Sequence, residues 1–468
     1  MNKIEKQATF KVKFTSYTHD GLGVCKINGI NKFGDELINF PIFVENALIN
    51  EEGIIEITEV HKTFGLGKIK KLFIDKLSNK RVDVKCPIYD DCGGCHLLHM
   101  SYDAQMEFKR QRVIDAFERI GGFEKPNVLP TIKSENQFNY RNKVQIPFGF
   151  KNKKTICGFY KRESHDIIPL TNCLLQSDTA TEIVKFIKNI CNELMIKGFD
   201  EETKTGDIKH VLIKESSSNQ EIMVVFVTKT KLIKNFDVLV NKLTLKFNQI
   251  VSIYQNINKE DTNVILGDTN ILLYGKEHIT DEILNRQFII GPMSFFQVNT
   301  KTTSKLYQTA INMGKFNKND IVIDAYSGIG TIGISISNQV KEVYQVEIVK
   351  EAWELSKENI RLNNIKNIKT YHNDAVKQIE IWKNEGLTAD AIIVDPPRKG
   401  LDINFMNTIN EMNIKKIVYI SCDVSTMARD IKYLNSLGYE FNEIQPVDMF
   451  PNTLHVETVI CLSQKTQK

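Results

Sequence analysis

The sequence of 468 residues contains no run of about 18 apolar residues, the length at which a membrane-spanning helix becomes a candidate. Its first ten residues, MNKIEKQATF, also lack the apolar stretch of a secretory signal peptide. We therefore expect a cytoplasmic protein that does not bind membranes. Charged residues make up 25% of the chain and hydrophobic residues 42%, a balance that argues against a disordered or fibrous protein.

Net charge and cysteine content are both low. The formal charge of +4 says little about the partner, because the distribution of charge matters more than its sum. Nine cysteines in a chain of this length, in a reducing compartment, favour metal ligands or a nucleophile over disulfides. Nothing in the pattern indicates a coiled coil, so we expect a monomer.

The chain is too long for one ordinary core, and three regimes follow one another along it. Residues 1–70 contain short β-like runs separated by turn signals such as HDGLG and NEEG, which predict a small β-barrel. Residues 71–285 mix a helical stretch near 102–120 with β-runs such as EIMVVFVTK, without repeats or low-complexity segments. From 286 to 468 strands and helices alternate, which predicts a mostly parallel sheet covered by helices on both faces.

Lys and Arg are concentrated in two stretches. Residues 139–162 hold seven Lys or Arg, five aromatic residues and no acidic residue, and residues 61–85 hold eight Lys or Arg against two Asp. Cations mixed with aromatic rings suit phosphate neutralisation and stacking on unpaired bases. A solvated surface hairpin explains the stretch 139–162 equally well, but two such stretches together favour an RNA partner.

The segment DAYSGIGTIG, residues 324–333, places three glycines between a strand and a helix. Such a turn lets the backbone approach a nucleotide-like ligand and fits NAD as well as S-adenosylmethionine. Glu347 ends the next strand, VYQVEI, where a carboxylate accepts the ribose hydroxyls of either ligand. A later strand ends in DPPRKG, residues 395–400, whose two prolines stiffen the loop. That loop is not a dehydrogenase feature, and its combination with the glycine turn favours S-adenosylmethionine over a merely rigid turn.

A cysteine follows the apolar strand in KIVYISCDVS, residues 416–425. Cys422 is therefore expected at the carboxyl edge of the sheet, beside the crevice in which doubly wound folds bind their ligands. An isolated cysteine at such a place is explained by core packing. Because Cys422 shares this edge with Asp395, a chemical role is favoured.

Four ordered segments, DAYSGIGTIG, DPPRKG, ISCDVSTMARD and HVETV, together resemble the S-adenosylmethionine-dependent RNA uracil-C5 methyltransferase family. The segment CPIYDDCGGC, with PLTNCLLQ downstream, resembles the iron-sulfur site of the branch that acts on 23S ribosomal RNA. The resemblance implies an α/β chain with a Rossmann-like class I methyltransferase domain, an N-terminal OB-like β-barrel (TRAM) and a central α+β iron-sulfur domain. The implied ranges are 1–70 for the TRAM barrel, 71–285 for the iron-sulfur domain and 286–468 for the methyltransferase domain.

The resemblance also implies roles for individual residues. Cys422 matches the nucleophile that adds to carbon 6 of uracil, and Glu457, in HVETV, matches the base that removes the hydrogen from carbon 5. Phe295 or its neighbour Phe296 matches an aromatic that stacks on RNA. The implied contacts to S-adenosylmethionine are Gln297, Tyr326, Glu347 and Asp395. The implied ligands of a [4Fe-4S] cluster are Cys86, Cys92, Cys95 and Cys173.

The chemistry of the target atom explains the need for a thiol. Carbon 5 of uracil is too weak a nucleophile to take a methyl group from a sulfonium, so a thiolate must first add to carbon 6. An ordinary cysteine has a pKa of about 8.5, and the positive sulfonium of the cofactor is suited to stabilise the thiolate. A uracil held in a helix or stack must also be extruded, which accounts for an RNA-gripping half of the chain.

Several alternatives stay open. Four cysteines also permit zinc, although three within ten residues and a distant fourth favour the cluster. Cytosine-C5 RNA methyltransferases carry a second cysteine in the proline motif, which DPPRKG lacks, and adenine-N6 enzymes usually show an aromatic where this chain has Arg398. A transfer RNA substrate, or a non-catalytic RNA-binding protein that retains the cofactor pocket, are the alternatives to methylation of ribosomal RNA.

Overall fold

The computed structural model describes residues 2–31, 33–260, 262 and 264–465. It divides into two compact units, each described by itself below. The first comprises residues 1–90, 94–112 and 452–454, and the second comprises residues 91–93, 113–451 and 455–468. In the described ranges, no helix combines the length and the apolar character that a bilayer span requires.

The first unit is built on a six-stranded sheet with the order β1-β5-β6-β4-β3-β2. Its strands alternate buried and exposed residues, as in β5, where Ile55 and Ile57 enter the core and their neighbours face outward. The sheet curls, because the backbone N–H of Ile4, ahead of β1, donates to the carbonyl of Ile30 in β3 at 2.8 Å. The strands are β1 (Thr9–Lys13), β2 (Ser16–Tyr17), β3 (Gly23–Ile30), β4 (Glu36–Val44), β5 (Glu52–Val60) and β6 (Gly65–Leu72).

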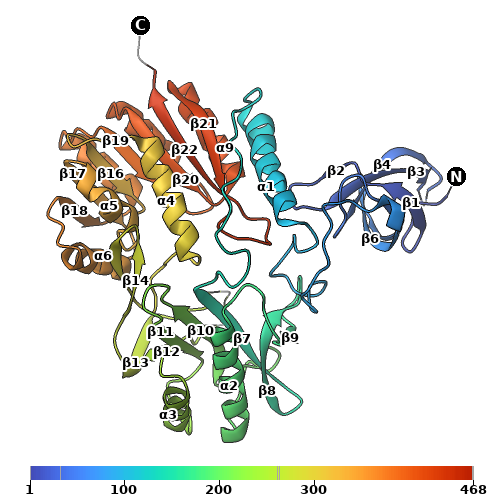
Figure 1. The fold of residues 1–468 in the computed structure, drawn as a ribbon, viewed down its shortest axis with the longest axis horizontal. Helices are drawn as coiled ribbons and strands as arrows, with labels where there is room; N and C mark the ends of the chain where they lie inside the picture. The colour runs from blue at the N-terminus through green and yellow to red at the C-terminus, as the bar shows by residue number, and fades with distance from the viewer. Residues whose placement is uncertain (1, 32, 261, 263, 466–468) are drawn as a thin grey trace. The chain divides into compact units, whose positions relative to one another are not determined.

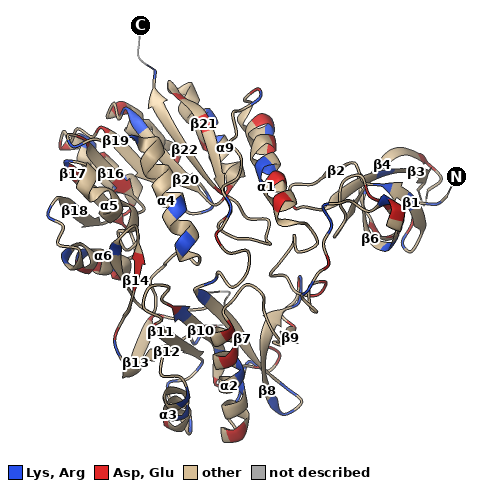
Figure 2. Cartoon of the chain, viewed as in Figure 1, with Lys and Arg blue, Asp and Glu red and all other residues tan. Residues whose placement is uncertain are grey.

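A short 3₁₀ helix (Ile74–Lys76) follows this sheet, and the expected helix near residues 102–120 is α1 (Tyr102–Ala116). α1 continues into a π-helical turn, Phe117–Gly121, and the division between the two units falls within α1. Both acidic and basic residues lie along α1 (Figure 2). The all-β beginning of the chain and this helix are thus confirmed, whereas a TRAM identity of the first unit stays a prediction.

The second unit contains a seven-stranded sheet with the order β13-β12-β11-β10-β7-β8-β9 (Figure 1, green to yellow). Alternate residues of its central strands enter different cores: Val224 and Phe226 pack with α2 and α3, whereas Met223 and Val225 pack on the opposite face. The elements are β7 (Lys143–Lys151), β8 (Lys154–Tyr160), β9 (Ile167–Pro169), α2 (Asp178–Leu194), β10 (Ile208–Glu215), β11 (Ile222–Thr228), α3 (Phe236–Lys246), β12 (Ile250–Ile257) and β13 (Thr269–Gly275).

A hairpin of β14 (Ile279–Ile283) and β15 (Arg286–Ile290) leads to a second seven-stranded sheet, with the order β18-β17-β16-β19-β20-β22-β21 (Figure 1, orange to red). The strands from β18 to β20 in this order pair in parallel, and β22 runs antiparallel to both of its neighbours, β20 and β21. The strands are β16 (Ile321–Ala325), β17 (Glu342–Glu347), β18 (Ile368–His372), β19 (Ala391–Val394), β20 (Lys416–Ser421), β21 (Tyr439–Val447) and β22 (Glu457–Gln464).

Helices cover both faces of this sheet, which confirms the predicted doubly wound α/β arrangement. Buried side chains of α7, α8 and α9 form one core with alternate strand residues such as Tyr419, and those of α4, α5 and α6 form the other with Val418 and Ile420. The helices are α4 (Thr300–Gly314), α5 (Thr331–Ile336), α6 (Lys350–Leu362), α7 (Ala375–Asn384), α8 (Ile403–Glu411) and α9 (Val424–Ser436), and a 3₁₀ turn (Ser337–Gln339) follows α5. The strand order reverses between β16 and β19, the position at which such folds bind ligands.

Candidate active site

The carboxyl ends of the parallel strands carry most of the residues that the sequence singles out. Tyr326 follows β16, Glu347 ends β17, Asp395 follows β19 and Cys422 follows β20. Glu457 begins β22, and because β22 is antiparallel to β20, the start of β22 lies at the same edge as the end of β20. Strand direction therefore brings these side chains to one edge of the sheet.

The glycine turn between β16 and α5 is shaped around a buried carboxylate. Asp324 Oδ2 accepts hydrogen bonds from the backbone N–H of Gly333 at 2.8 Å and from Gln345 Nε2 at 2.9 Å. A Cβ on Gly333 would lie only 2.3 Å from Gln345 Nε2, so this position requires glycine. Gly330 begins α5 with a φ of +89°, a left-handed conformation that glycine adopts without strain.

Glu347 is held in place by backbone groups on both of its carboxylate oxygens. Oε2 accepts from the N–H of Gly328 at 2.8 Å, and Oε1 accepts from the N–H of Val349 at 2.7 Å. The residue is buried at the end of β17. These bonds fix the carboxylate beside the glycine turn while leaving lone pairs that can accept further hydroxyl donors.

Gln297 and Tyr326 approach this region from different elements. Gln297 is buried and lies near the side chain of Tyr307 on α4, and burial together with Asp395 raises the pKa of Tyr307 above its usual range. The backbone carbonyl of Gln297 accepts from Asn142 Nδ2 at 2.9 Å. Tyr326 has a φ of +64°, which is uncommon for a non-glycine residue and is found at sites under functional constraint.

Cys422 lies in a cluster of ionisable groups. Burial, followed by the nearby carboxylates of Glu457 and Asp395, raises the pKa of the Cys422 thiol to about 11, while the positive charge of Arg398 acts in the opposite direction. Asp423, directly after the cysteine, caps α9 by accepting the N–H groups of Ser425 and Thr426, each at 3.0 Å. The aspartate thus fixes the helix start, and the thiol lies at the positive end of the helix dipole.

The carboxyl groups of the cluster favour their protonated forms. Burial and the neighbouring Asp395 raise the pKa of Glu457 to about 8, and Arg398 lowers it in part. Burial and Asp324 raise the pKa of Asp395 to about 7, and burial raises that of Asp324 to about 6. A pocket with this balance of charge favours a cationic ligand, because a cation would relieve the cost of ionising these carboxyls.

The structure thus brings together Cys422, Glu457 and Asp395, and it adds residues that the sequence reasoning gave no role. Arg398 lies beside the Cys422 thiol, and Tyr307 lies beside Gln297. Arg398 directly follows the two prolines in DPPRKG, so its closeness to Asp395 in the sequence could have indicated a place in the site. Tyr307 occupies one turn of an ordinary amphipathic helix and gives no signal in the sequence.

The four cysteines of the expected cluster are divided between the two units. Cys86 and Cys95 belong to the first unit, and Cys92 and Cys173 belong to the second. Burial and the nearby Cys92 thiol raise the pKa of Cys173, so one pair of the predicted ligands lies close together. Within the described ranges, no group of three or more His, Cys, Asp or Glu side chains is arranged to hold a metal ion. The cluster therefore stays a prediction.

The first basic stretch, residues 61–85, is partly used within the fold. Arg81 pairs with the buried carboxylate of Glu51 at 2.6 Å. Lys68 and Lys70 both pair with Glu56, at 2.8 and 2.9 Å. These three cations stabilise the first unit, so the stretch offers fewer groups to a phosphate backbone than its composition indicates.

The second basic stretch, residues 139–162, forms the β7–β8 hairpin and its flanks. Tyr140 and Phe148 are buried, and burial lowers the pKa of Lys143, so only part of the aromatic and basic residues faces solvent. Lys and Arg gather at the turn between β7 and β8 (Figure 2). Stacking on bases by all five aromatics is thus excluded, because the hairpin uses Tyr140 and Phe148 as core. Of the two candidate stacking residues elsewhere, Phe295 is 63% exposed and Phe296 is buried.

Comparisons with known proteins cover nearly the whole chain. Residues 102–465 match the family model described as tRNA (Uracil-5-)-methyltransferase. A Bacillus cereus protein described as an uncharacterized RNA methyltransferase is 41% identical over 461 residues, which is 98% of each chain. A Staphylococcus epidermidis protein with the same description is 41% identical over 469 residues and 100% of each chain. The solved Pyrococcus abyssi tRNA (uracil-54, C5)-methyltransferase, in complex with S-adenosyl-L-homocysteine, matches with a TM-score of 0.74 at 26% identity, over 97% of this chain and 100% of that chain.

Proposed function

Since this chain belongs to the tRNA (uracil-5-)-methyltransferase family, we propose that it methylates carbon 5 of a uridine in 23S ribosomal RNA through a covalent adduct with Cys422. Family membership makes S-adenosylmethionine the methyl donor and uracil in RNA the acceptor, as the sequence predicts. The observation that carries the catalytic proposal is the convergence of Cys422, Glu457, Asp395 and Arg398 at one edge of the sheet.

The residues around the glycine turn fit S-adenosylmethionine, which when bound supplies an electrophilic methyl group on a positive sulfonium. Asp395, whose pKa is raised by burial and by Asp324, is suited to face that positive charge. Glu347 is already oriented by two backbone N–H groups and is proposed to accept the ribose hydroxyls. Gln297 and Tyr326 complete the proposed contacts to the cofactor.

We assign the covalent chemistry to Cys422 and Glu457. The Cys422 thiol loses its proton to solvent on its exposed side, and the thiolate forms a bond to carbon 6 of the uracil, which leaves carbon 5 electron-rich. Carbon 5 then forms a bond to the methyl group, the bond between that methyl group and the sulfonium breaks, and its electron pair stays on the sulfur of the S-adenosylhomocysteine that leaves. Glu457 accepts the hydrogen of carbon 5 as a proton, the carbon 6–sulfur bond breaks, and the electron pair of that bond returns to the sulfur.

The other parts of the chain are proposed to hold the RNA, with residues 1–70 and 71–285 gripping it and residues 286–468 performing the transfer. The exposed ring of Phe295 is the proposed stacking residue, because Phe296 is used by the core. We expect the protein to act as a monomer.

The test is methyl transfer from radiolabelled S-adenosylmethionine to unmodified transcripts of 23S ribosomal RNA and of transfer RNA, followed by nucleoside analysis. The expected product is 5-methyluridine in the ribosomal transcript, with no product from Cys422→Ala. Cys461→Ala, which removes a partly buried thiol of β22, serves as the matched control and should be active. Labelled product from Cys422→Ala at the normal rate would exclude the covalent route, and methylcytidine in place of methyluridine would exclude the assigned base.

Transfer RNA is the second candidate substrate. The observation in its favour is the match over the whole chain to a solved enzyme described as a tRNA (uracil-54, C5)-methyltransferase. Methylation of the transfer RNA transcript alone in the same experiment would select this alternative and would leave the catalytic assignments unchanged.

We further propose that Cys86, Cys92, Cys95 and Cys173 hold a [4Fe-4S] cluster. The proximity of Cys92 and Cys173 supports two of the four ligands, and thiolates are the donors that such clusters use. Methyl transfer involves no net oxidation or reduction, so the cluster would have a structural role. Anaerobically purified protein should contain iron and acid-labile sulfide, both lost in Cys173→Ser, whereas equimolar zinc without iron would overturn the proposal.

A further inference from the structure

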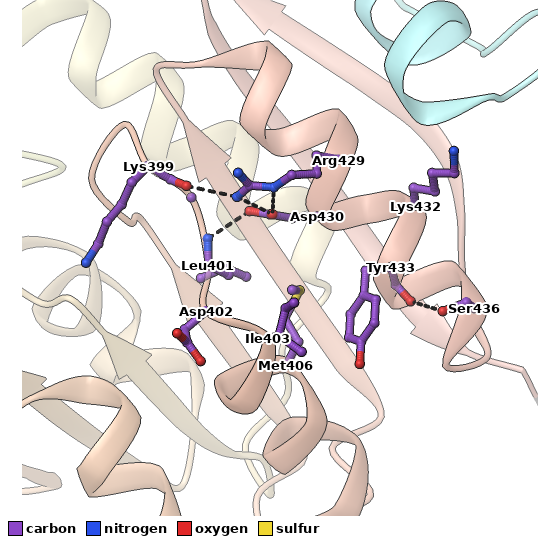
Figure 3. A pocket seen from close by; sticks show the side chains of 11 residues that line it. Lys399, Leu401, Asp402, Ile403, Met406, Arg429, Asp430, Lys432, Tyr433 and Ser436 are labelled. Carbon is purple, nitrogen blue, oxygen red and sulfur yellow. Dashed lines mark hydrogen bonds and ion pairs between the residues drawn. The ribbon is translucent and has the colours of Figure 1, made fainter.

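A pocket with a volume of about 690 Å³ lies beside the loop that carries Asp395 and Arg398. Its wall begins at Lys399, the residue after Arg398, and continues through the first turn of α8 to the outer side of α9 (Figure 3). The pocket is separate from the glycine turn between β16 and α5, none of whose residues line it. It thus adjoins the proposed active site and belongs to the same unit.

The floor of the pocket is apolar. Leu401 and Met406 are buried beneath it, Ile403 is 57% exposed, and the ring of Tyr433 lies next to them (Figure 3). The hydroxyl of Tyr433 donates to Asn407 Oδ1 at 2.8 Å, which fixes the ring in place. A large exposed aliphatic side chain beside a fixed aromatic ring is a surface on which a planar base can stack.

The rim of the pocket is basic. Lys399 and Lys432 lie on opposite sides of it (Figure 3), and neither forms an ion pair with any other residue in the described part of the chain. Both of the acidic residues that line the pocket are engaged in the fold. Asp402 caps α8 by accepting the N–H of Asn404 at 2.8 Å, and Asp430 is almost fully buried.

The pocket is rigid, because Asp430 ties its two walls together. Its carboxylate accepts hydrogen bonds from the N–H of Leu401 at 2.8 Å, from Tyr419 at 2.8 Å and from Arg429 at 2.7 Å. Arg429 also donates to the carbonyl of Lys399 at 2.8 Å. These hydrogen bonds join the loop to α9, as expected of a preformed binding site.

We propose that this pocket binds an unpaired nucleotide of the RNA substrate, with the base on the apolar floor and the flanking phosphates at Lys399 and Lys432. An apolar floor between two separated cations matches a base between two phosphates, whereas a purely apolar ligand would leave both cations unused. The position next to Arg398 makes this nucleotide a neighbour of the target uridine. The inference rests on the proposed function and specifies which part of the RNA the enzyme holds.

The test compares two pocket variants, Lys432→Glu and Ile403→Ser, with the control Lys341→Glu. Lys341 is exposed and directly precedes β17, so the control makes the same charge change at the amino edge of the sheet. Both pocket positions are exposed, and thermal melting checks that each variant folds. The KM for the methylated transcript should rise on the order of tenfold in each pocket variant, with kcat and the Kd for S-adenosylmethionine changed less than about twofold.

Salt dependence separates the two contributions. Lys432→Glu should reduce the slope of log affinity against log salt by about 1, measured by fluorescence anisotropy of the labelled transcript, while Ile403→Ser should leave the slope unchanged. Equal KM values in Lys432→Glu, Ile403→Ser and the control would overturn the proposal. Failure of the proposed function is a different result, namely no methylation by the wild-type protein, and the anisotropy measurement still tests the pocket in that event.

Discussion

Arg398 lies beside the thiol of Cys422, and its positive charge favours the ionised forms of both Cys422 and Glu457. Arg398→Ala should therefore raise the pKa of the Cys422 thiol, and each unit of that rise lowers the thiolate fraction about tenfold. We expect kcat to fall about 10- to 100-fold. The pH dependence of Cys422 alkylation by iodoacetamide measures the pKa directly. Arg398→Lys keeps the charge, so its Cys422 pKa should lie between those of the wild-type protein and Arg398→Ala. Superimposable pH profiles of alkylation for all three proteins would contradict the role of Arg398.

Binding of S-adenosylmethionine should accelerate alkylation of Cys422, because a positive sulfonium near the thiol favours the thiolate. S-adenosylhomocysteine is the matched control, since it lacks the methyl group and the positive charge. Mass spectrometry of the peptide that contains Cys422 gives the rate. Faster alkylation with the first ligand and not with the second is expected, and equal rates with both would remove the electrostatic explanation.

The contribution of Glu457 and Asp395 to the free energy of unfolding should decrease as pH rises from about 4 to about 8. Burial raises the pKa of Glu457 to about 8 and that of Asp395 to about 7, whereas carboxyls in an unfolded chain have values near 4. The folded protein therefore holds more protons than the unfolded chain in this window, and deprotonation favours unfolding.

Glu457→Gln removes one of these titrations. Its Tm should exceed that of the wild-type protein by a few degrees at pH 8.5 and by less at pH 5, as measured by calorimetry. Glu358→Gln, on the exposed side of α6, should change Tm equally little at both values. A Tm difference for Glu457→Gln that does not depend on pH would show that Glu457 is ionised in the folded protein throughout.

Glu457→Gln and Cys422→Ala should differ in the RNA adducts that they form. Without the base, the methylated uracil keeps its bond to Cys422, so Glu457→Gln should give a protein–RNA species that survives denaturing electrophoresis. Cys422→Ala should give none. Digestion of the trapped species and mass spectrometry of the cysteine peptide locate the bond, and an adduct on a different cysteine would reassign the nucleophile.

Asp430 should affect catalysis through the loop that it holds. Asp430→Asn weakens the bonds to Leu401, Tyr419 and Arg429, and we expect a loss of about 1–3 kcal/mol in the free energy of unfolding. Because the same loop carries Asp395 and Arg398, kcat should fall as well. Asp402→Ala removes the cap of α8 at a cost of about 1 kcal/mol and is the control for stability. Equal effects of Asp430→Asn and Asp402→Ala on kcat would show that Asp430 contributes to stability alone.

The parts of the fold that local pattern determines were predictable. The alternation after residue 286 gave the doubly wound sheet, and the glycine turn and the loop DPPRKG lie where strand direction requires. Long-range pairing was not predictable, because β22 inserts between β20 and β21 against the sequence order. The proximity of Arg398 and Cys422 likewise depends on the positions of the loops after β19 and β20 relative to each other, which a local sequence pattern does not predict.

Composition was a weaker guide than motif. The stretch 139–162 has the composition of an RNA-binding segment, yet Tyr140 and Phe148 are core residues of a hairpin. Periodicity does not separate them, because residues 146–149 of β7 are all buried, Phe148 among them, and Tyr140 precedes the strand. The division of the four cysteines between two units was hidden for a different reason, since Cys92 lies within three residues of Cys95 in the sequence but is grouped with the other unit.

The insertion of β22 between β20 and β21 also bears on synthesis. A ribosome-bound chain that has completed α9 already contains the glycine turn and the thiol, but the carboxylate of Glu457 arrives only after β21 has formed and the chain has turned back. Until β22 pairs with β20, the nascent protein lacks the proposed base beside the proposed nucleophile. We therefore expect turnover to begin only when the sheet is complete.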